Sequence, residues 1–235
     1  MNFSDNYNNI LVIRPLVNDM VTDINEIPVI KKTSIDNYFL NKLEVTNFKN
    51  LNSIKYRRLT IIDSFNDDYV LARLWNDPLK YVSKFSELFA VASPDFSVYP
   101  EMNRIMILNN IFKSRWIGAF WQSFGVNVIP TITWALEDTY DICFSGVEKN
   151  GIVIISTLGV AKNYDIFIKG FNEMKKRLNP QLIIVIGKLY PDMEGNFLHY
   201  TLNDTFNPKK KVQQLRLFRM AHHIIKSGGE ISYGW

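Results

Sequence analysis

The sequence predicts an α/β protein built on a mostly parallel sheet with crossover helices. Its candidate strands are short and continuously apolar, and helical patterns fill the roughly 25–40 residues between them, as in sheets that are buried on both faces. Two architectures fit this pattern: an open doubly wound sheet and a partial (β/α) barrel. A complete barrel of eight units needs about 250 residues, and only five clear strands can be found, so both alternatives stay open.

The composition of the 235 residues is that of a globular protein with a sizeable core. Hydrophobic residues make up 47% of the chain, charged residues make up 21%, and the formal net charge is +4. A positive balance of this size permits a phosphate-bearing partner but does not require one.

Cysteine usage and hydropathy predict a protein of a reducing cytoplasm. Cys143 is the single cysteine, so no disulfide can form within the chain. No apolar run reaches the roughly 18–20 residues of a membrane span. Residues 1–5 lack the basic start and apolar core of a signal peptide. We therefore expect a cytoplasmic protein with no membrane association.

Residues 1–55 are the least regular part of the chain. They are rich in Asn and Asp, and only short apolar pieces interrupt the polar sequence. We expect an ordered but irregular N-terminal region that wraps the main domain and can contribute one strand.

Residues 56–190 carry the regular alternation and form the expected α/β core domain. Asn76-Asp77-Pro78 favours a helix start, because Asn or Asp can cap the helix and proline is tolerated in its first turn. A long helix is predicted from about Pro100 to Ser123, ended by Gly125, and another helix is predicted to have its cap at Asn163. The predicted strands are Leu59–Ile62, Phe89–Ala92, Val126–Ile132, Ile152–Ser156 and Leu182–Ile186.

Residues 191–235 are predicted to form a loop, a candidate edge strand over Phe197–Thr201, and a basic helix from about Pro208 to Lys226 that packs on the core. The helix resembles a surface that contacts nucleic-acid phosphates, although charge runs of this size also occur on solvated helix faces. Its candidate nucleic-acid-binding residues are Lys209, Lys210, Lys211, Arg216 and Arg219.

Polar residues follow the predicted strands, where α/β proteins usually place their chemistry. Asp63 and Asp95 are the candidate catalytic residues, because two carboxyl groups can act as an acid/base pair or bind Mg²⁺. The structural alternative is that Asp95 caps a helix or forms an Asx-turn, and that Trp134 belongs to the core. The candidate ligand-binding residues at the same edge are Ser97, Thr133, Trp134, Ser156 and Thr157.

Further candidate ligand-binding residues lie on the long helix. At 100° per residue, Arg104, Arg115 and Gln122 fall within roughly 20° of one another. Two guanidinium groups on one face can bind a phosphate or a carboxylate. The alternative is a solvated basic stripe, or arginines that pair with acidic neighbours.

Several short motifs resemble a known family in their order and spacing. They are Ser93-Pro94-Asp95-Phe96-Ser97, Asn103-Arg104, Trp121-Gln122 with Gly125, Val128-Ile129-Pro130 with Trp134, Phe144-Ser145-Gly146, Ser156-Thr157 with Gly159, and Phe171. Over about residues 60–190 this pattern is similar to the family called domain of unknown function 4417, met mainly in phages and mobile elements of Gram-positive bacteria. The resemblance implies such an origin and a bacterial cytoplasm, and it carries no catalytic role. The family's last strand tends to end in Tyr-Gly, where this chain has Ile186-Gly187.

The absence of several known motifs disfavours the common nucleotide-binding and serine-hydrolase classes, and three hypotheses stay open. No phosphate-binding loop, dinucleotide fingerprint or serine nucleophile elbow occurs in the sequence. With one cysteine and the adjacent pair His222-His223, a zinc site of the usual kind is not expected.

The first hypothesis is a nucleic-acid-associated phage or mobile-element protein acting in replication, transfer or host takeover. The second is a hydrolase or small-ligand-binding protein with its pocket at the strand ends. The third is an interaction protein that engages a host protein. The sequence indicates neither a cofactor nor an oligomeric state.

Overall fold

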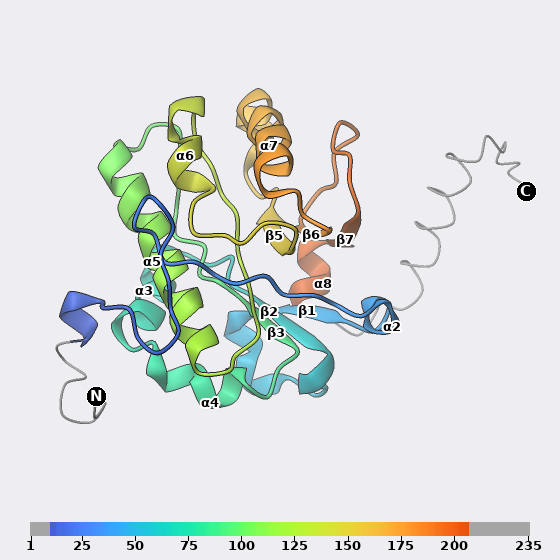
Figure 1. Cartoon of the computed structure of the whole chain (residues 1–235). Coiled ribbons are helices and arrows are strands. Elements are labelled where there is room, and N and C mark those ends of the chain that lie inside the picture. The colour runs from blue at the N-terminus through green and yellow to red at the C-terminus, as the bar shows by residue number, and fades with distance from the viewer. Residues whose placement is uncertain (1–9, 207–235) are drawn as a thin grey trace, which may run out of the picture.

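Seven parallel strands form the centre of the computed structural model, which describes residues 10–206 (Figure 1). The first four strands pair in chain order, and so do the last three. The bounds are β1 Glu44–Asn47, β2 Thr60–Asp63, β3 Ala90–Ala92, β4 Val128–Ile129, β5 Ile152–Ser156, β6 Leu182–Ile186 and β7 Phe197–Tyr200.

A single parallel bridge joins the two groups of strands. Thr131, just after β4, pairs with Ile154 of β5, and the backbone bonds around this bridge are 2.9 and 3.0 Å long. The strands therefore follow one another around the sheet in the order of the chain. This order favours the partial barrel, because a doubly wound sheet reverses its strand order at a switch point. The expected α/β class with parallel strands is confirmed.

Within residues 10–206, no ladder pairs β7 with β1, so the sheet stays open between its first and last strands. Side chains and α8 (Leu202–Phe206) fill this gap. The buried Tyr200 hydroxyl donates a hydrogen bond to the Leu43 carbonyl at 2.8 Å. The Thr46 hydroxyl donates to the Thr205 carbonyl at 2.9 Å. The barrel is thus completed by packing and side-chain hydrogen bonds, without closure of the sheet.

Both faces of the sheet are buried, which explains the continuous apolar runs of its strands. Alternate residues of a strand point to opposite faces, so Ile61 packs in the barrel interior while Ile62 packs under the surrounding helices. The interior cluster takes side chains from all seven strands, including Val45, Ala92, Ile129, Ile154, Ile184 and Leu198.

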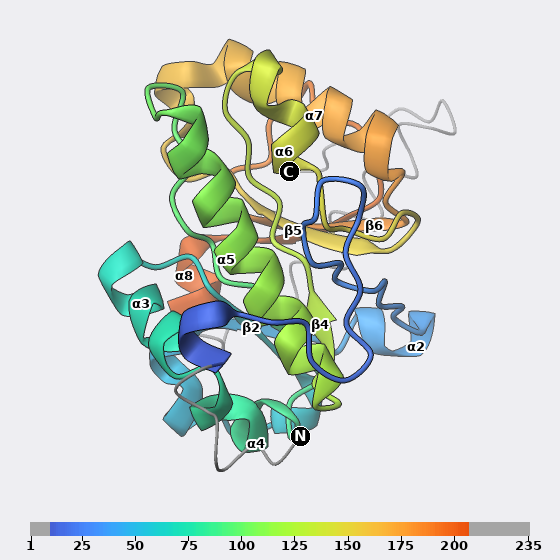
Figure 2. The ribbon, with the colours of Figure 1, turned by 60° about the vertical axis from the view of Figure 1, so that its left-hand side comes forward.

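The helices lie around the outside of the sheet (Figures 1 and 2). The longest, α5, begins after the capping side chain of Asn103, which accepts a hydrogen bond from the Ile105 N–H at 2.9 Å. The helices from α2 to α7 have the bounds α2 Asn37–Leu40, α3 Asp68–Asn76, α4 Val82–Phe85, α5 Arg104–Ser123, α6 Tyr140–Cys143 and α7 Tyr164–Leu178.

The segment before α2 runs across α5 (Figure 2). Its Ile30 lies so close to Gly118 of α5 that a Cβ at position 118 would be 2.5 Å from the Ile30 side chain. The Ile30 N–H donates to the Gly146 carbonyl at 3.0 Å, which ties the same segment to the chain beyond α6.

The structure differs from the sequence-based expectation in several elements. Strand β1 lies within residues 1–55, which were expected to be able to contribute one strand, although its bounds were not predicted. Helix α3 was not predicted, and β4 is shorter than the expected Val126–Ile132. The helix expected after Pro78 consists of the short 3₁₀ helix Leu79–Tyr81 followed by α4. Phe197–Tyr200 is a strand at the end of its ladder, parallel to β6. The basic helix expected from about Pro208 lies outside the described residues.

Candidate functional site

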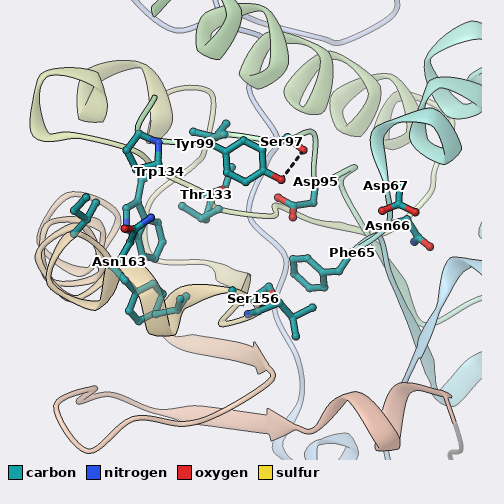
Figure 3. Close-up of a pocket in the computed structure, with 18 of the residues that line it drawn as sticks. Phe65, Asn66, Asp67, Asp95, Ser97, Tyr99, Thr133, Trp134, Ser156 and Asn163 are labelled. Carbon is teal, nitrogen blue, oxygen red and sulfur yellow. Dashed lines mark hydrogen bonds between the residues drawn. The ribbon is translucent and has the colours of Figure 1, made fainter. Parts of the chain in front are cut away.

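An open cleft of about 490 Å³ lies at the carboxyl ends of β1 to β5 (Figure 3). Its size is within the range of small-molecule sites. The segments after β2, β3, β4 and β5 each contribute polar side chains to its wall. These and the other main lining residues are Lys49, Phe65, Asn66, Asp67, Asp95, Ser97, Tyr99, Ile132, Thr133, Trp134, Ser156, Asn163 and Phe167.

Asp95 lies in the loop between β3 and α5, and surrounding hydrogen bonds hold this loop in place. The Ser93 hydroxyl accepts from the Thr131 N–H at 2.9 Å, and the Ser97 carbonyl accepts from the Asn110 side chain at 2.8 Å. The Ser97 N–H and hydroxyl both donate to Asp68 Oδ1 at 3.0 Å. The Asp95 carboxyl itself makes no hydrogen bond to any described residue, and it is partly exposed to the cleft.

The electrostatic environment favours the protonated form of Asp95. Burial of the carboxyl in the cleft raises its pKa to about 7, and the negative charges of Asp68 and Asp63 add to the effect. The nearby Arg115 guanidinium opposes it. Asp95 can therefore both hold and release a proton close to neutral pH.

Asp63 lies at the end of β2 and is 1% exposed, so it is not part of the cleft wall. Its Oδ1 accepts hydrogen bonds from the Asn47 side chain at 2.8 Å and from the Phe65 N–H at 3.2 Å, while its Oδ2 is buried without a partner. Burial raises the pKa of Asp63 to about 6, although both hydrogen bonds act in the opposite direction. Asp63 thus affects Asp95 through its charge.

Several other polar side chains of the cleft have no hydrogen-bond partner in the described part of the protein. Asp67 and Asn163 precede helices, yet neither side chain caps its helix. The Nδ2 of Asn66 is buried without a partner. The Lys49 ammonium and the Thr133 hydroxyl also make no side-chain hydrogen bond within residues 10–206. These groups are free to bind a ligand.

Trp134 forms one wall of the cleft (Figure 3). Its ring stacks on Phe167, with centroids 5.3 Å apart and planes inclined by 29°. A Cβ at position 170 would lie 2.1 Å from Trp134 Cδ1, so only glycine fits there on α7. Trp134 is therefore held rigidly as part of the core and also faces the cleft, which combines the two alternatives considered for it.

Of the candidates predicted from the sequence, five line this cleft: Asp95, Ser97, Thr133, Trp134 and Ser156. Thr157 lines a neighbouring hollow over β5 to β7, where its hydroxyl donates to the Lys188 carbonyl at 2.8 Å. The structure therefore brings together residues that follow β3, β4 and β5, as expected for parallel strands.

The three candidates on α5 do not line the cleft. Arg115 is fully buried and donates to the carbonyls of Ser145, Thr131 and Cys143 at 3.0, 2.8 and 3.0 Å. Gln122 binds both backbone groups of Lys31, and Arg104 pairs with Asp141 at 2.9 Å. The helix face predicted to bind a ligand thus binds other parts of the chain, and Arg104 fits the alternative of an arginine paired with an acidic neighbour.

The candidate nucleic-acid-binding residues lie outside the described residues. These residues are Lys209, Lys210, Lys211, Arg216 and Arg219, and their role stays a prediction. Within residues 10–206, no group of three or more His, Cys, Asp or Glu side chains is arranged to hold a metal ion. None of the helices described is both long and apolar enough to cross a membrane.

Comparison with known proteins assigns the chain to a family. The model of the family described as Domain of unknown function (DUF4417) matches residues 20–204. The chain belongs to this family. It is 38% identical over 128 residues to the Gene 1 protein of Mycobacterium phage L5, a match that covers 53% of this chain and 56% of the relative. For the Gene 1 protein of Mycobacterium phage D29 the identity is 36%, over 53% of this chain and 47% of the relative.

The chain thus spans about half the length of these relatives, and the matched region extends beyond the 60–190 segment on which the resemblance was based. No solved structure matches the chain. The family assignment predicted from the sequence is confirmed, and the named relatives are phage proteins.

Sequence reasoning missed Lys49, Asn66, Asp67, Tyr99 and Asn163 as cleft residues. The polar turn after the Leu59–Ile62 run contained the signal for Asn66 and Asp67, since a polar segment after a buried parallel strand lies at the functional edge. Asn163 is the N-cap residue of α7, as predicted, but its side chain makes no capping bond and faces the cleft instead. Lys49 could not be placed because the position of the strand before it was not predicted.

Proposed function

We propose that the cleft binds a small polar ligand and that Asp95 exchanges a proton with it. The observation that supports this proposal is the group of polar side chains that face the cleft without a partner among the described residues, with Asp95 at its centre. Leaving a buried polar group unpaired is costly, so the buried Nδ2 of Asn66 and the partly buried Asp95 carboxyl favour a binding role over a structural one. The exposed side chains of Lys49, Asp67 and Asn163 add polar groups that a ligand can reach.

The proton affinity of Asp95 suits acid–base chemistry. A general acid or base works best when its pKa is near the working pH, and the pKa of Asp95 is raised to about 7. A carboxyl group of ordinary pKa would be fully ionised at neutral pH and could only accept a hydrogen bond. Asp95 can donate to the ligand as the acid and accept from it as the base.

The site is preorganised, which supports binding without a large conformational change. The loop that carries Asp95 is tied to the end of β4 through Ser93 and to α3 through Asp68. On the other side of the cleft, Phe167 and Gly170 hold the Trp134 ring.

The proposal is tested by thermal unfolding of the full chain with panels of sugars, nucleosides, carboxylic acids and amines, each with and without Mg²⁺. A compound that binds the folded state raises the melting temperature. We expect such a compound to stabilise the wild-type protein and the control variant Asp138→Asn, whose exposed carboxylate lies outside the cleft. Asp95→Asn should lose the response while it stays folded. An equal response in Asp95→Asn, or no response to any panel, contradicts the proposal.

The phage relatives support the further proposal that the protein is a phage or mobile-element product that acts in the cytoplasm of a bacterial host. Association with nucleic acid through residues 209–219 is a separate proposal. Its test is binding of labelled single- and double-stranded DNA across a salt series, since phosphate contacts make affinity fall steeply with salt. An affinity indifferent to salt contradicts it.

A further inference from the structure

We infer that the ligand of the cleft is a nucleoside, with its base at the Trp134 end and its sugar at the Asn66–Asp67 end. This inference rests on the proposed function and names its ligand class. It follows from how side-chain chemistry changes along the cleft, from the segment after β2 to the segments after β4 and β5.

The end of the cleft at β4, β5 and α7 is aromatic and apolar. Trp134 and Phe167 stack there, and Ile132 and Val160 complete the wall. Aromatic side chains of this kind stack on nucleobases whatever their identity. The Asn163 amide lies at the same end without a partner among the described residues. An amide both donates and accepts hydrogen bonds, and so can pair with the polar edge of a nucleobase. A hydrocarbon ring has no such polar edge and would leave the amide without a partner.

The opposite end, after β1 and β2, is polar. Asp67 offers an unpaired carboxylate, Asn66 offers a buried unpaired amide donor, and Lys49 offers a cation. A carboxylate that accepts from sugar hydroxyls is the usual partner of a ribose in nucleotide sites. A nucleobase without its sugar would leave the polar groups at this end of the cleft without hydrogen-bond partners.

The distance between the two ends fits one nucleoside. The strand β3 lies between β2 and β4 in the sheet, so the segment that carries Asp67 and the segment that carries Trp134 start two strand spacings, roughly 10 Å, apart. This is the span of a base joined to a pentose. Asp95 comes from the strand between them, and Figure 3 shows it between Trp134 and Asp67. Its carboxyl would therefore face the junction of base and sugar.

The charges that line the cleft argue against a nucleoside triphosphate. Lys49 is the one cationic side chain among the described lining residues, and Asp67 offsets it. A chain of phosphates is normally held by several cations or backbone N–H groups. A nucleoside and its 5′-monophosphate share the base and sugar that the cleft recognises. They differ in the phosphate, for which Lys49 is the available cationic partner among the described lining residues.

The test is calorimetric titration of the full chain with adenosine, guanosine, cytidine, uridine and adenosine 5′-monophosphate, with free ribose and adenine as fragments. We expect at least one nucleoside to bind, and each fragment to bind about tenfold or more weakly, because each contacts only one end. Tyr99 also lines the cleft, and Figure 3 shows its ring between Trp134 and Asp95, where it can stack on the ligand. Tyr99→Ala and Asp67→Asn should each weaken binding about tenfold, the effect of losing one stacking or charged contact. Lys49→Gln should weaken the monophosphate alone if the phosphate is held.

Matched variants outside the cleft control for general effects. Tyr69→Ala removes a tyrosine that is 68% exposed, against 57% for Tyr99, and Asp138→Asn removes an exposed carboxylate. Both should bind like the wild type. Binding that is unchanged in Tyr99→Ala and Asp67→Asn overturns the inference, as does the absence of binding by every nucleoside.

The failure of this inference can be told apart from failure of the proposed function. If sugars, amines or carboxylic acids bind in a manner that depends on Asp95 while nucleosides do not, the nucleoside inference is overturned and the proposed function stands. If nucleosides bind equally well to the wild type and to Asp95→Asn, the proton-exchange role of Asp95 is overturned.

Discussion

Gly170 and Trp134 are so close that no side chain fits between them: a Cβ on Gly170 would lie 2.1 Å from Trp134 Cδ1 and 2.2 Å from its Nε1. This contact allows α7 to approach the end of β4 and fixes one wall of the cleft. It explains a glycine inside a helix, where alanine would otherwise be favoured by about 1 kcal/mol.

Gly170→Ala should displace the Trp134 ring and lower the free energy of unfolding by about 1–3 kcal/mol, the usual cost of overpacking. Urea unfolding measures the loss, and tryptophan fluorescence reports the altered surroundings of the ring. Asn172→Ala, on the exposed side of the same helix, is the control and should change stability by less than about 0.5 kcal/mol. A stabilised Gly170→Ala variant would show that the contact does not constrain the helix.

Stability should fall as the pH rises from 5 to 8. In the folded state the pKa of Asp95 is raised to about 7 and that of Asp63 to about 6, from an ordinary value of 3.8. The folded protein thus binds these protons more tightly than the unfolded chain, and their contribution to stability is lost as the pH rises through these values. At about 1.4 kcal/mol per tenfold change in proton affinity, Asp95 contributes at most roughly 4 kcal/mol.

Urea unfolding at pH 5 and pH 8 measures this dependence. Asp95→Asn should flatten the pH profile and be more stable than the wild type at pH 8, whereas Asp138→Asn should keep the wild-type profile. Wild-type stability that is constant or rises over this range contradicts the assignment of a raised pKa.

Asn47→Ala should destabilise the protein by about 1–3 kcal/mol, because it removes a buried donor from Asp63. The loss should be greater at pH 8 than at pH 5, since the hydrogen bond stabilises the ionised carboxylate. The comparison is Asn52→Ala, at an exposed position of the 3₁₀ helix Phe48–Ser53, whose first turn the Asn47 side chain caps by accepting from the Lys49 N–H. An equal loss at both pH values would mean that Asn47 acts through packing and this cap, and not through the charge of Asp63.

Arg115→Ala and Arg104→Ala should differ widely in stability, although the two side chains share one helix face. Arg115→Ala leaves a cavity and three buried carbonyls without their donor, so it should cost at least about 3 kcal/mol. Arg104→Ala removes an exposed ion pair and should cost less than about 1 kcal/mol. Chemical denaturation compares the two, and similar losses would refute the structural role of Arg115.

The fold and part of the site could be predicted from the sequence because they depend on local patterns. The run Leu182–Ile186 is apolar throughout and the run Ile152–Ser156 is apolar up to its last residue, and both are strands with these bounds. Because parallel strands bring their carboxyl ends to one edge, Asp95 and Trp134 could be expected to meet there.

The remainder depends on distant partners that the sequence does not reveal. Strand β1 contains Thr46 and Asn47, whose polar side chains are buried only because Thr205 and Asp63 bind them. Arg115 follows the periodicity of a surface residue, but the chain around Ser145 and Thr131 covers it. These contacts join residues 16 to 159 positions apart.

Nuclear magnetic resonance of the Asp95 carboxyl carbon from pH 4 to pH 9 in the full chain measures the proton affinity on which the proposed role of the cleft depends. We expect a titration midpoint near pH 7. This midpoint should move down in Asp63→Asn, because the neighbouring negative charge is removed. A midpoint near pH 4, unaffected by that substitution, would show an ordinary solvated carboxylate and would contradict the proposed role of the cleft.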